Sequence, residues 1–290
     1  MNKQILLATV TAMALASCSS DDKDIPADTP VASGTYVARV VNVDYRPAPG
    51  QFINEMPEYV AGDNATAMNV KCRNILNRED GLISLGSFGG SVTMELEQPV
   101  VNHHGSGDFK VMGNAFAGNA EPGIVEVSAD GANWYSLKGE KWGDSQAAFT
   151  VTYYRPADDA TDENYIKWEG SDGTSGWINR VASHHTQPFF PQWGDQTAAS
   201  VTFTARRLPD NASFNSGNGQ YTLAPYWGYA DSYPNTSDES WLHLDNAVDA
   251  TGAPVNLTSV SYIRITTSVL AANGALGEES TEISHIVVRP

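Results

Sequence analysis

From Thr35 to its last residue, the chain consists of short apolar or alternating segments that Gly, Asn, Asp and Pro interrupt every few residues. In the segment 91–97, for example, Val92, Met94 and Leu96 alternate with polar residues. A period of two is the pattern of a β-strand with one buried face. The pattern predicts strands at 36–44, 82–86, 91–97, 108–113, 123–129, 133–137, 148–154, 200–207, 260–267 and 282–288.

One segment has helical periodicity instead. The apolar positions 68, 72, 75 and 76 are spaced as one face of a helix, and Asp63 or Asn64 can cap its start. One short helix among many strands predicts an all-β fold, a jelly-roll-like β-sandwich. Between two of the strands, Asp130-Gly131 predicts a tight hairpin, because glycine accepts the positive φ that such a turn needs.

The stretch 155–259 is less regular and rich in aromatic residues among Gly, Asn, Asp and Pro. We interpret it as long loops and hairpins inserted before the last strands of one sandwich domain at 35–290. A separate small domain at about 155–255 is the alternative.

The first residues have the parts of a bacterial export signal. Lys3 supplies a positive charge, residues 5–16 are apolar, and Leu15-Ala16-Ser17-Cys18 matches a lipobox. We therefore expect a cleaved signal peptide at 1–17, with Cys18 acylated as the first mature residue and the lipid as the membrane anchor. An ordinary secretory signal that happens to end in cysteine is the alternative.

Residues 18–34 combine aspartates, prolines and small residues, which predicts an acidic flexible tether. Its first part, Ser19-Ser20-Asp21-Asp22-Lys23-Asp24, resembles the export tag of Bacteroidota-type lipoproteins, and this resemblance implies an outer-membrane protein that faces the cell exterior. The formal net charge of the chain is −17. Such an excess of negative charge argues against nucleic acid and anionic lipid surfaces as partners.

The chain has two cysteines, of which Cys18 is expected to be acylated. Cys72 then has no partner for an intramolecular disulfide, so a hydrophobic core must stabilise the fold. We predict that Cys72 is a small buried side chain of that core rather than a nucleophile.

Three segments suggest a family. GGSVTMEL at 89–96, DFKVMGNAF at 108–116 and GIVEVSADGANWYSL at 123–137 resemble, in this order, bacterial "cell surface proteins" related to galactose-binding-like, discoidin-type jelly rolls. The resemblance implies a sandwich without a settled enzymatic activity. Relatives accompany corrinoid (vitamin B12) uptake systems that include a TonB-dependent outer-membrane transporter, and discoidin-type relatives bind sugars, often with a structural calcium ion.

A binding surface for a sugar or a flat ligand needs exposed aromatic faces beside polar groups. The loop-rich stretch offers such rings among Asn, Asp and Gly, and loops on a rigid scaffold commonly carry binding residues. The alternative is that these rings cap the core. The predicted ligand-binding residues are Trp193, Trp227, Tyr229, Tyr233 and Trp241.

Metal binding is less clearly indicated. Calcium takes oxygen ligands, which Asp108, Asn114, Glu121 and the acidic segment 158–162 could supply, although a solvated loop explains 158–162 as well. The pairs His103-His104 and His184-His185 have no Cys or carboxylate at metal-ligand spacing, which favours surface-loop histidines over a zinc site.

The sequence contains no G-x-S-x-G, H-E-x-x-H, P-loop or Rossmann glycine motif. We therefore expect a non-catalytic cell-surface protein for nutrient capture, with a corrinoid or a glycan as the ligand and no certain cofactor. A carbohydrate-binding adhesin and a glycan-active enzyme are the alternatives, because a pair of glycosidase carboxylates cannot be recognised among 34 acidic residues.

Overall fold

The computed structural model describes residues 34–157, 164–180, 187–271 and 277–290. The expected signal peptide, Cys18 and nearly all of the tether lie outside these residues, as do the acidic segment 158–162 and the pair His184-His185. Of the helices in the described ranges, none has the length and apolar character required to span a bilayer.

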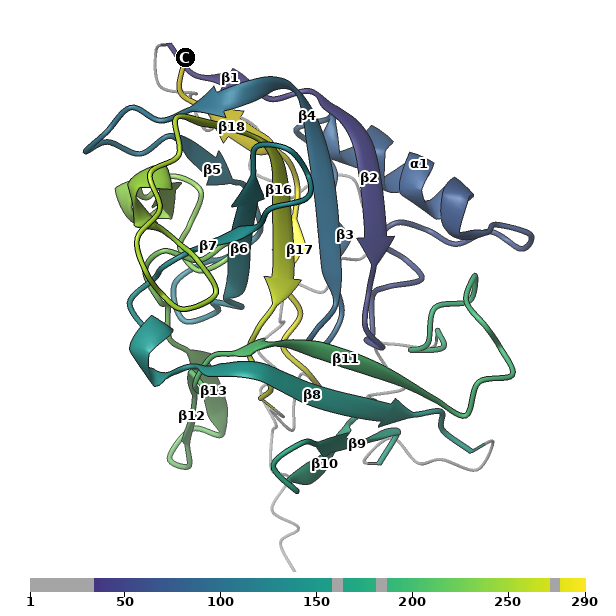
Figure 1. Cartoon of the computed structure of the whole chain (residues 1–290). Helices are drawn as coiled ribbons and strands as arrows, with labels where there is room; N and C mark the ends of the chain where they lie inside the picture. The colour runs from purple at the N-terminus through teal and green to yellow at the C-terminus, as the bar shows by residue number, and fades with distance from the viewer. Residues whose placement is uncertain (1–33, 158–163, 181–186, 272–276) are drawn as a thin grey trace, which may run out of the picture.

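The largest layer is an antiparallel six-stranded sheet (Figure 1). Its strands, in spatial order, are β15 (Ala247–Val248), β7 (Tyr135–Leu137), β6 (Gly123–Ser128), β16 (Ser259–Thr267), β4 (Ser91–Val101) and β2 (Val40–Arg46). The long central strand β16 pairs with β4 on one side and with β6 on the other. Segments far apart in the sequence therefore form the middle of this sheet.

A second layer covers the inner face of the six-stranded sheet. It contains a four-stranded sheet in the order β1 (Tyr36–Val37), β18 (Ile286–Val288), β5 (Phe109–Val111) and β14 (Trp241–Leu242), and the pair β3 (Ile83–Ser84) and β17 (Glu282–Ile283). Met94 and Ile263 from one layer join Phe109 and Ile286 from the other in one buried cluster. The predicted all-β sandwich is confirmed, because the apolar faces of two layers meet in a common core.

The predicted helix is α1 (Ala65–Leu76), which packs against β2. Asn64 is its N-cap, and the side-chain oxygen of Asn64 accepts a hydrogen bond from the backbone N–H of Ala67. Cys72 is a free, fully buried cysteine on the inner face of the helix, as predicted.

A further four-stranded sheet has the order β10 (Ser175–Ile178), β9 (Ile166–Gly170), β8 (Gln146–Tyr154) and β11 (Ser200–Arg207). β8 and β11 cross the lower end of the six-stranded sheet in Figure 1. The sheet has its own core, in which Phe149, Tyr153 and Phe189 cluster with Phe88 from the segment between β3 and β4. At this junction Gly89 lies so close to Phe203 that an added Cβ would be 2.4 Å from the Phe203 Cβ.

The stretch 155–259 is more regular than the sequence predicted. Besides β9, β10, β14 and β15, it contains the hairpin β12 (Ala212–Asn215) and β13 (Gln220–Leu223) and the short 3-10 helices η2 (Asp238–Ser240) and η3 (Leu244–Asn246). Another 3-10 helix, η1 (Trp142–Asp144), precedes β8. Strands of two to five residues hold too few positions for a period of two to be recognised. Two predicted strands are each divided in the structure. The segment 36–44 gives β1 and the start of β2, and the segment 282–288 gives β17 and β18.

Candidate functional site: an aromatic–arginine platform

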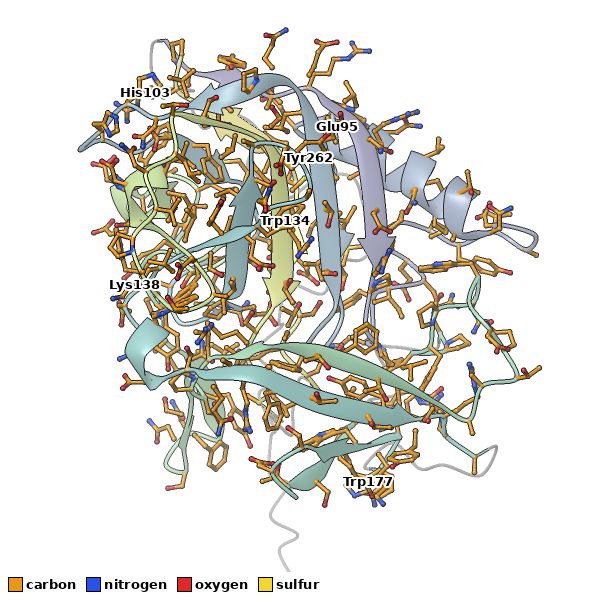
Figure 2. The ribbon with its side chains drawn as sticks, in the orientation of Figure 1. Glu95, His103, Trp134, Lys138, Trp177 and Tyr262 are labelled. Carbon is orange, nitrogen blue, oxygen red and sulfur yellow. The ribbon has the colours of Figure 1, made fainter. Side chains whose placement is uncertain are left out.

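The outer face of the six-stranded sheet carries a cluster of polar and aromatic side chains. Tyr262 and Arg264 alternate on β16 with the buried Ile263 and Ile265. The register places Tyr262 opposite Glu95 of β4, and Arg264 opposite Glu126 of β6. Glu95, Tyr262 and Trp134 lie together in the middle of this face in Figure 2. Cross-strand neighbours on one face are close enough for direct contact.

These side chains contact one another. The Tyr262 hydroxyl donates a hydrogen bond to Glu95 Oε1 at 3.1 Å. Arg264 Nη1 donates to Glu126 Oε2 at 3.3 Å, and the Arg264 guanidinium carbon lies 3.8 Å from the centre of the Trp134 ring. Trp134 also meets Tyr262 edge to face, with 6.5 Å between the ring centroids. We call these five residues the Trp134 platform.

The turn between β6 and β7 positions Trp134. Asp130 Oδ1 accepts hydrogen bonds from the backbone N–H groups of Ala132 and Asn133, which hold the pKa of this carboxyl well below its usual range. The Trp134 indole N–H donates to the carbonyl oxygen of Gly131 at 3.1 Å. Gly131 has a φ of 73°, as expected for this glycine, but the connection from Ser128 to Tyr135 is longer than the tight turn that was predicted. The ring is therefore fixed before any ligand arrives, which lowers the entropic cost of binding.

A second arginine–tryptophan stack lies next to the platform. The guanidinium carbon of Arg206, at the end of β11, lies 3.8 Å from the centre of the Trp142 ring of η1. Arg206 also donates a hydrogen bond to Ser145 Oγ at 2.9 Å. Partial burial lowers the pKa of Arg206, while the charge of Glu126 opposes this shift, so Glu126 interacts with both arginines.

The predicted ligand-binding rings do not gather on one face. Trp193 packs against Tyr45, with 5.9 Å between the ring centroids, at the edge of the sandwich core. Trp241 lies in the other layer, on β14, where Lys110 Nζ is 5.1 Å from the centre of its ring and the Arg289 guanidinium carbon is 4.6 Å from it. Trp193 and Trp241 therefore belong to different parts of the sandwich and cannot form one stacking surface.

The prediction that Tyr229 binds ligand is corrected by its position in the structure. Its side chain is buried, with only 3% of the residue exposed, and it packs with Ile124, Leu208 and Tyr226. Its ring presents no face to a ligand, so the alternative of a core-capping aromatic holds for Tyr229. Trp227 and Tyr233 are half-buried, and the Trp227 ring lies 6.1 Å from that of His243.

The binding residues predicted from the sequence do not include Trp134, Trp142, Arg206 or Arg264. A signal for Trp134 was available, because it lies three residues after the glycine of the Asp130-Gly131 turn. Arg264 lies at a polar-face position of a predicted strand, but the pattern of one strand does not reveal its cross-strand neighbours. Those neighbours follow from the register of three strands that are distant in the sequence.

Of the calcium candidates, Asp108 lies apart from Asn114 and Glu121, which both neighbour Glu282. Asp108 is fully buried and accepts hydrogen bonds from the backbone N–H groups of His103 and Leu244. Asn114 donates to a carboxylate oxygen of Glu282, and Glu121 and Glu282 repel each other within the same acidic cluster. Within the residues that the structure describes, no group of three or more His, Cys, Asp or Glu side chains is arranged to hold a metal ion.

The two best-defined hollows of the described chain are small. One, of about 10 Å³, is lined in part by Phe88, Trp168 and Glu279, and the other, of about 200 Å³, by Tyr36, Arg39 and Glu97 among others. Enclosed small-molecule sites usually have about 300–1,000 Å³. Neither hollow includes the Trp134 platform, which is an open surface.

No protein-family model matches the chain, and no curated protein matches it either. The function must therefore be inferred from the site itself.

Proposed function

We propose that this protein is a lipid-anchored cell-surface receptor that captures a glycan, without catalysis, on the Trp134 platform. The observation that carries this proposal is the stack of Trp134 on Arg264, at 3.8 Å, on an open sheet face. A half-buried indole that rests on a guanidinium has a fixed orientation, and such a flat apolar surface suits the C–H face of a sugar ring.

The polar groups around the ring suit the same ligand class. Glu95 and Glu126 can accept hydrogen bonds from sugar hydroxyls, and Arg264 and Tyr262 orient these carboxylates. Specific sites combine an apolar surface with a few placed polar groups in this manner. The open shape of the face supports an extended chain of sugars more than a compact ligand that must be enclosed.

Localisation is part of the proposal. Acylation of Cys18 would anchor the protein in the outer membrane, and the acidic tether would hold the sandwich outside the cell. Captured ligand would then pass to a TonB-dependent transporter in the same membrane. Replacement of Cys18 by Ala should abolish palmitate labelling and release the protein from the membrane; labelling that persists would contradict the anchor.

Binding can be tested with a glycan array, followed by calorimetric titration of the best glycan and of cyanocobalamin. We expect Trp134→Ala to weaken glycan binding about 5- to 150-fold, the equivalent of about 1–3 kcal/mol for a lost stacking face. Trp177 is the control, since it is an exposed tryptophan on β10 of the separate sheet. Equal weakening by Trp177→Ala, or binding of cyanocobalamin and no glycan by the wild type, would overturn the proposal.

A further inference from the structure

The loop between β4 and β5 contains two adjacent histidines, and each of them faces a carboxylate. The Nδ1 atom of His103 lies 3.2 Å from Asp108 Oδ1, and the Nδ1 atom of His104 lies 2.8 Å from Asp245 Oδ1. Asp245 is 141 positions from His104 in the sequence, so no spacing rule could have paired them. His103 lies at the upper left of Figure 2, away from the Trp134 platform.

Both carboxylates are themselves held in place. Asp108 accepts hydrogen bonds from the backbone N–H groups of His103 and Leu244, each at 2.7 Å. Asp245 accepts one from the backbone N–H of Gly105, also at 2.7 Å. Asp245 Oδ1 also accepts a hydrogen bond from the Asn102 side-chain amide at 3.0 Å.

The two carboxylates lie at the same element, η3 (Leu244–Asn246). Asp108 bonds the backbone of Leu244, the first residue of η3, and Asp245 is the next residue of that helix. Adjacent side chains of a strand point to opposite faces, but residues 103 and 104 lie outside β4. The alternation of a strand therefore does not separate the side chains of His103 and His104.

A carboxylate at Nδ1 determines which histidine nitrogen remains available. When Nδ1–H donates to the carboxylate, the Nε2 lone pair is free and more basic, which is the usual arrangement of a metal-ligating histidine. The His104 side chain is 64% exposed and that of His103 is 26% exposed, so solvent reaches both rings. His104 also has a φ of 30°, and non-glycine residues with positive φ are concentrated at functional sites.

We propose that His103 and His104 form a transition-metal site, with their Nε2 atoms as ligands for a borderline divalent ion such as Cu²⁺ or Zn²⁺. Imidazole nitrogen is a preferred ligand for both ions. In this proposal the loop supplies two protein ligands, since no group of three or more ligating side chains occurs among the described residues to add a third. Water or a bound molecule completes the coordination, so the metal is exchangeable.

The test is titration of the protein with Cu²⁺, followed by calorimetry and electron paramagnetic resonance. His184 and His185 are replaced by alanine in every sample, so that they do not contribute. We expect imidazole nitrogen couplings in the copper spectrum, and we expect His104→Ala to remove part of them and weaken binding at least 10-fold. Asp245→Asn should weaken binding about 10- to 100-fold, as loss of a carboxylate behind a ligating histidine usually does.

His243 provides the control, because it is another half-buried histidine but its ring lies against Trp227. His243→Ala should leave the affinity for Cu²⁺ and the copper spectrum unchanged. Circular dichroism of each variant checks that the fold is retained, and Asp245 is preferred to the buried Asp108 for this reason. Unchanged Cu²⁺ binding in the double variant His103→Ala/His104→Ala would overturn the proposal, as would an equal loss in His243→Ala.

Discussion

The guanidinium carbon of Arg264 lies 3.8 Å from the centre of the Trp134 ring, although the two residues are 130 positions apart in the sequence. Arg264 is held from the sides by Thr93 and Glu126, on the strands either side of β16. Trp134 reaches it from the end of a hairpin turn. Residues from three strands and a turn therefore determine the orientation of one aromatic face.

Replacement of Arg264 by Met should loosen Trp134 without exposing the core. The methionine side chain has a similar length but lacks the charge and the donors to Thr93 and Glu126, so the ring loses a cation–π contact of about 0.5–1 kcal/mol. We expect glycan affinity to fall several-fold and tryptophan fluorescence anisotropy to decrease. Arg46→Met is the control, because the ion pair of Arg46 with Asp44 is exposed; an equal effect there would contradict the role of Arg264.

Gly131→Ala should destabilise the protein more than Gly173→Ala. Both glycines have positive φ, at 73° and 82°, and this conformation costs an alanine about 1–2 kcal/mol. At Gly131 the added Cβ would also lie 3.2 Å from the Tyr262 ring, whereas at Gly173 no atom is within 4 Å. Urea unfolding should show about 1 kcal/mol of additional destabilisation at Gly131. Equal losses would mean that the turn and Tyr262 are not in tight contact.

The N-cap of α1 predicts that substitutions of Asn64 lower the free energy of unfolding by different amounts. Asn64→Ala should lower the free energy of unfolding by about 1 kcal/mol, because the backbone N–H of Ala67 loses its acceptor. Asn64→Ser retains an acceptor oxygen and should cost little. Thermal unfolding by circular dichroism measures the series, and a serine variant as unstable as the alanine variant would argue against capping.

Tyr229→Ala should affect stability rather than ligand binding. Tyr229 is buried among Ile124, Leu208 and Tyr226, so its removal leaves a cavity and should cost about 3–5 kcal/mol. Tyr233→Ala, at a half-buried position, should cost clearly less. Urea unfolding compares the two variants. If Tyr229→Ala instead weakened glycan binding at unchanged stability, the assignment of this ring to the core would be wrong.

Buried carboxyl groups predict that stability falls as the pH rises from about 4.5 to about 8. Burial raises the pKa of Glu278 to about 8 and that of Asp231 to about 7, and it also raises the pKa of Glu282. In the unfolded chain such groups titrate near pH 4. Between these values the folded protein binds more protons than the unfolded chain, so each added pH unit favours unfolding by about 1 kcal/mol per proton.

Urea unfolding at pH 5, 6, 7 and 8, with EDTA present, measures this dependence. Glu278→Gln keeps an uncharged side chain that can still accept the hydrogen bond of the Gln51 backbone N–H, so it should flatten the curve. Glu97→Gln is the control, because Glu97 is exposed on the outer face of β4 and should leave the slope unchanged. Stability that rises from pH 5 to pH 8 would contradict the raised pKa values.

The class of fold and its local elements could be predicted from patterns in the sequence. The alternation of Val92, Met94 and Leu96 specifies the buried face of β4, because side chains of a strand point alternately to its two faces. The spacing of Met68 and Cys72, with Asn64 as a cap, located α1, and Asp130-Gly131 located the hairpin. These features depend on neighbours within a few residues of one another, which a single sequence reveals.

Which residues contact one another depends on the tertiary structure. Trp193 and Trp241 both belong to the aromatic-rich stretch 155–259, yet they lie in different parts of the sandwich. Trp134 and Arg264, and likewise His104 and Asp245, are brought together by strand order and register. Composition indicates that an aromatic side chain is available, but burial depends on the layers that pack over it, as Tyr229 demonstrates. Contacts between distant segments follow from packing of the whole chain, because the hydrophobic effect that drives it is non-directional and does not select partners along the sequence.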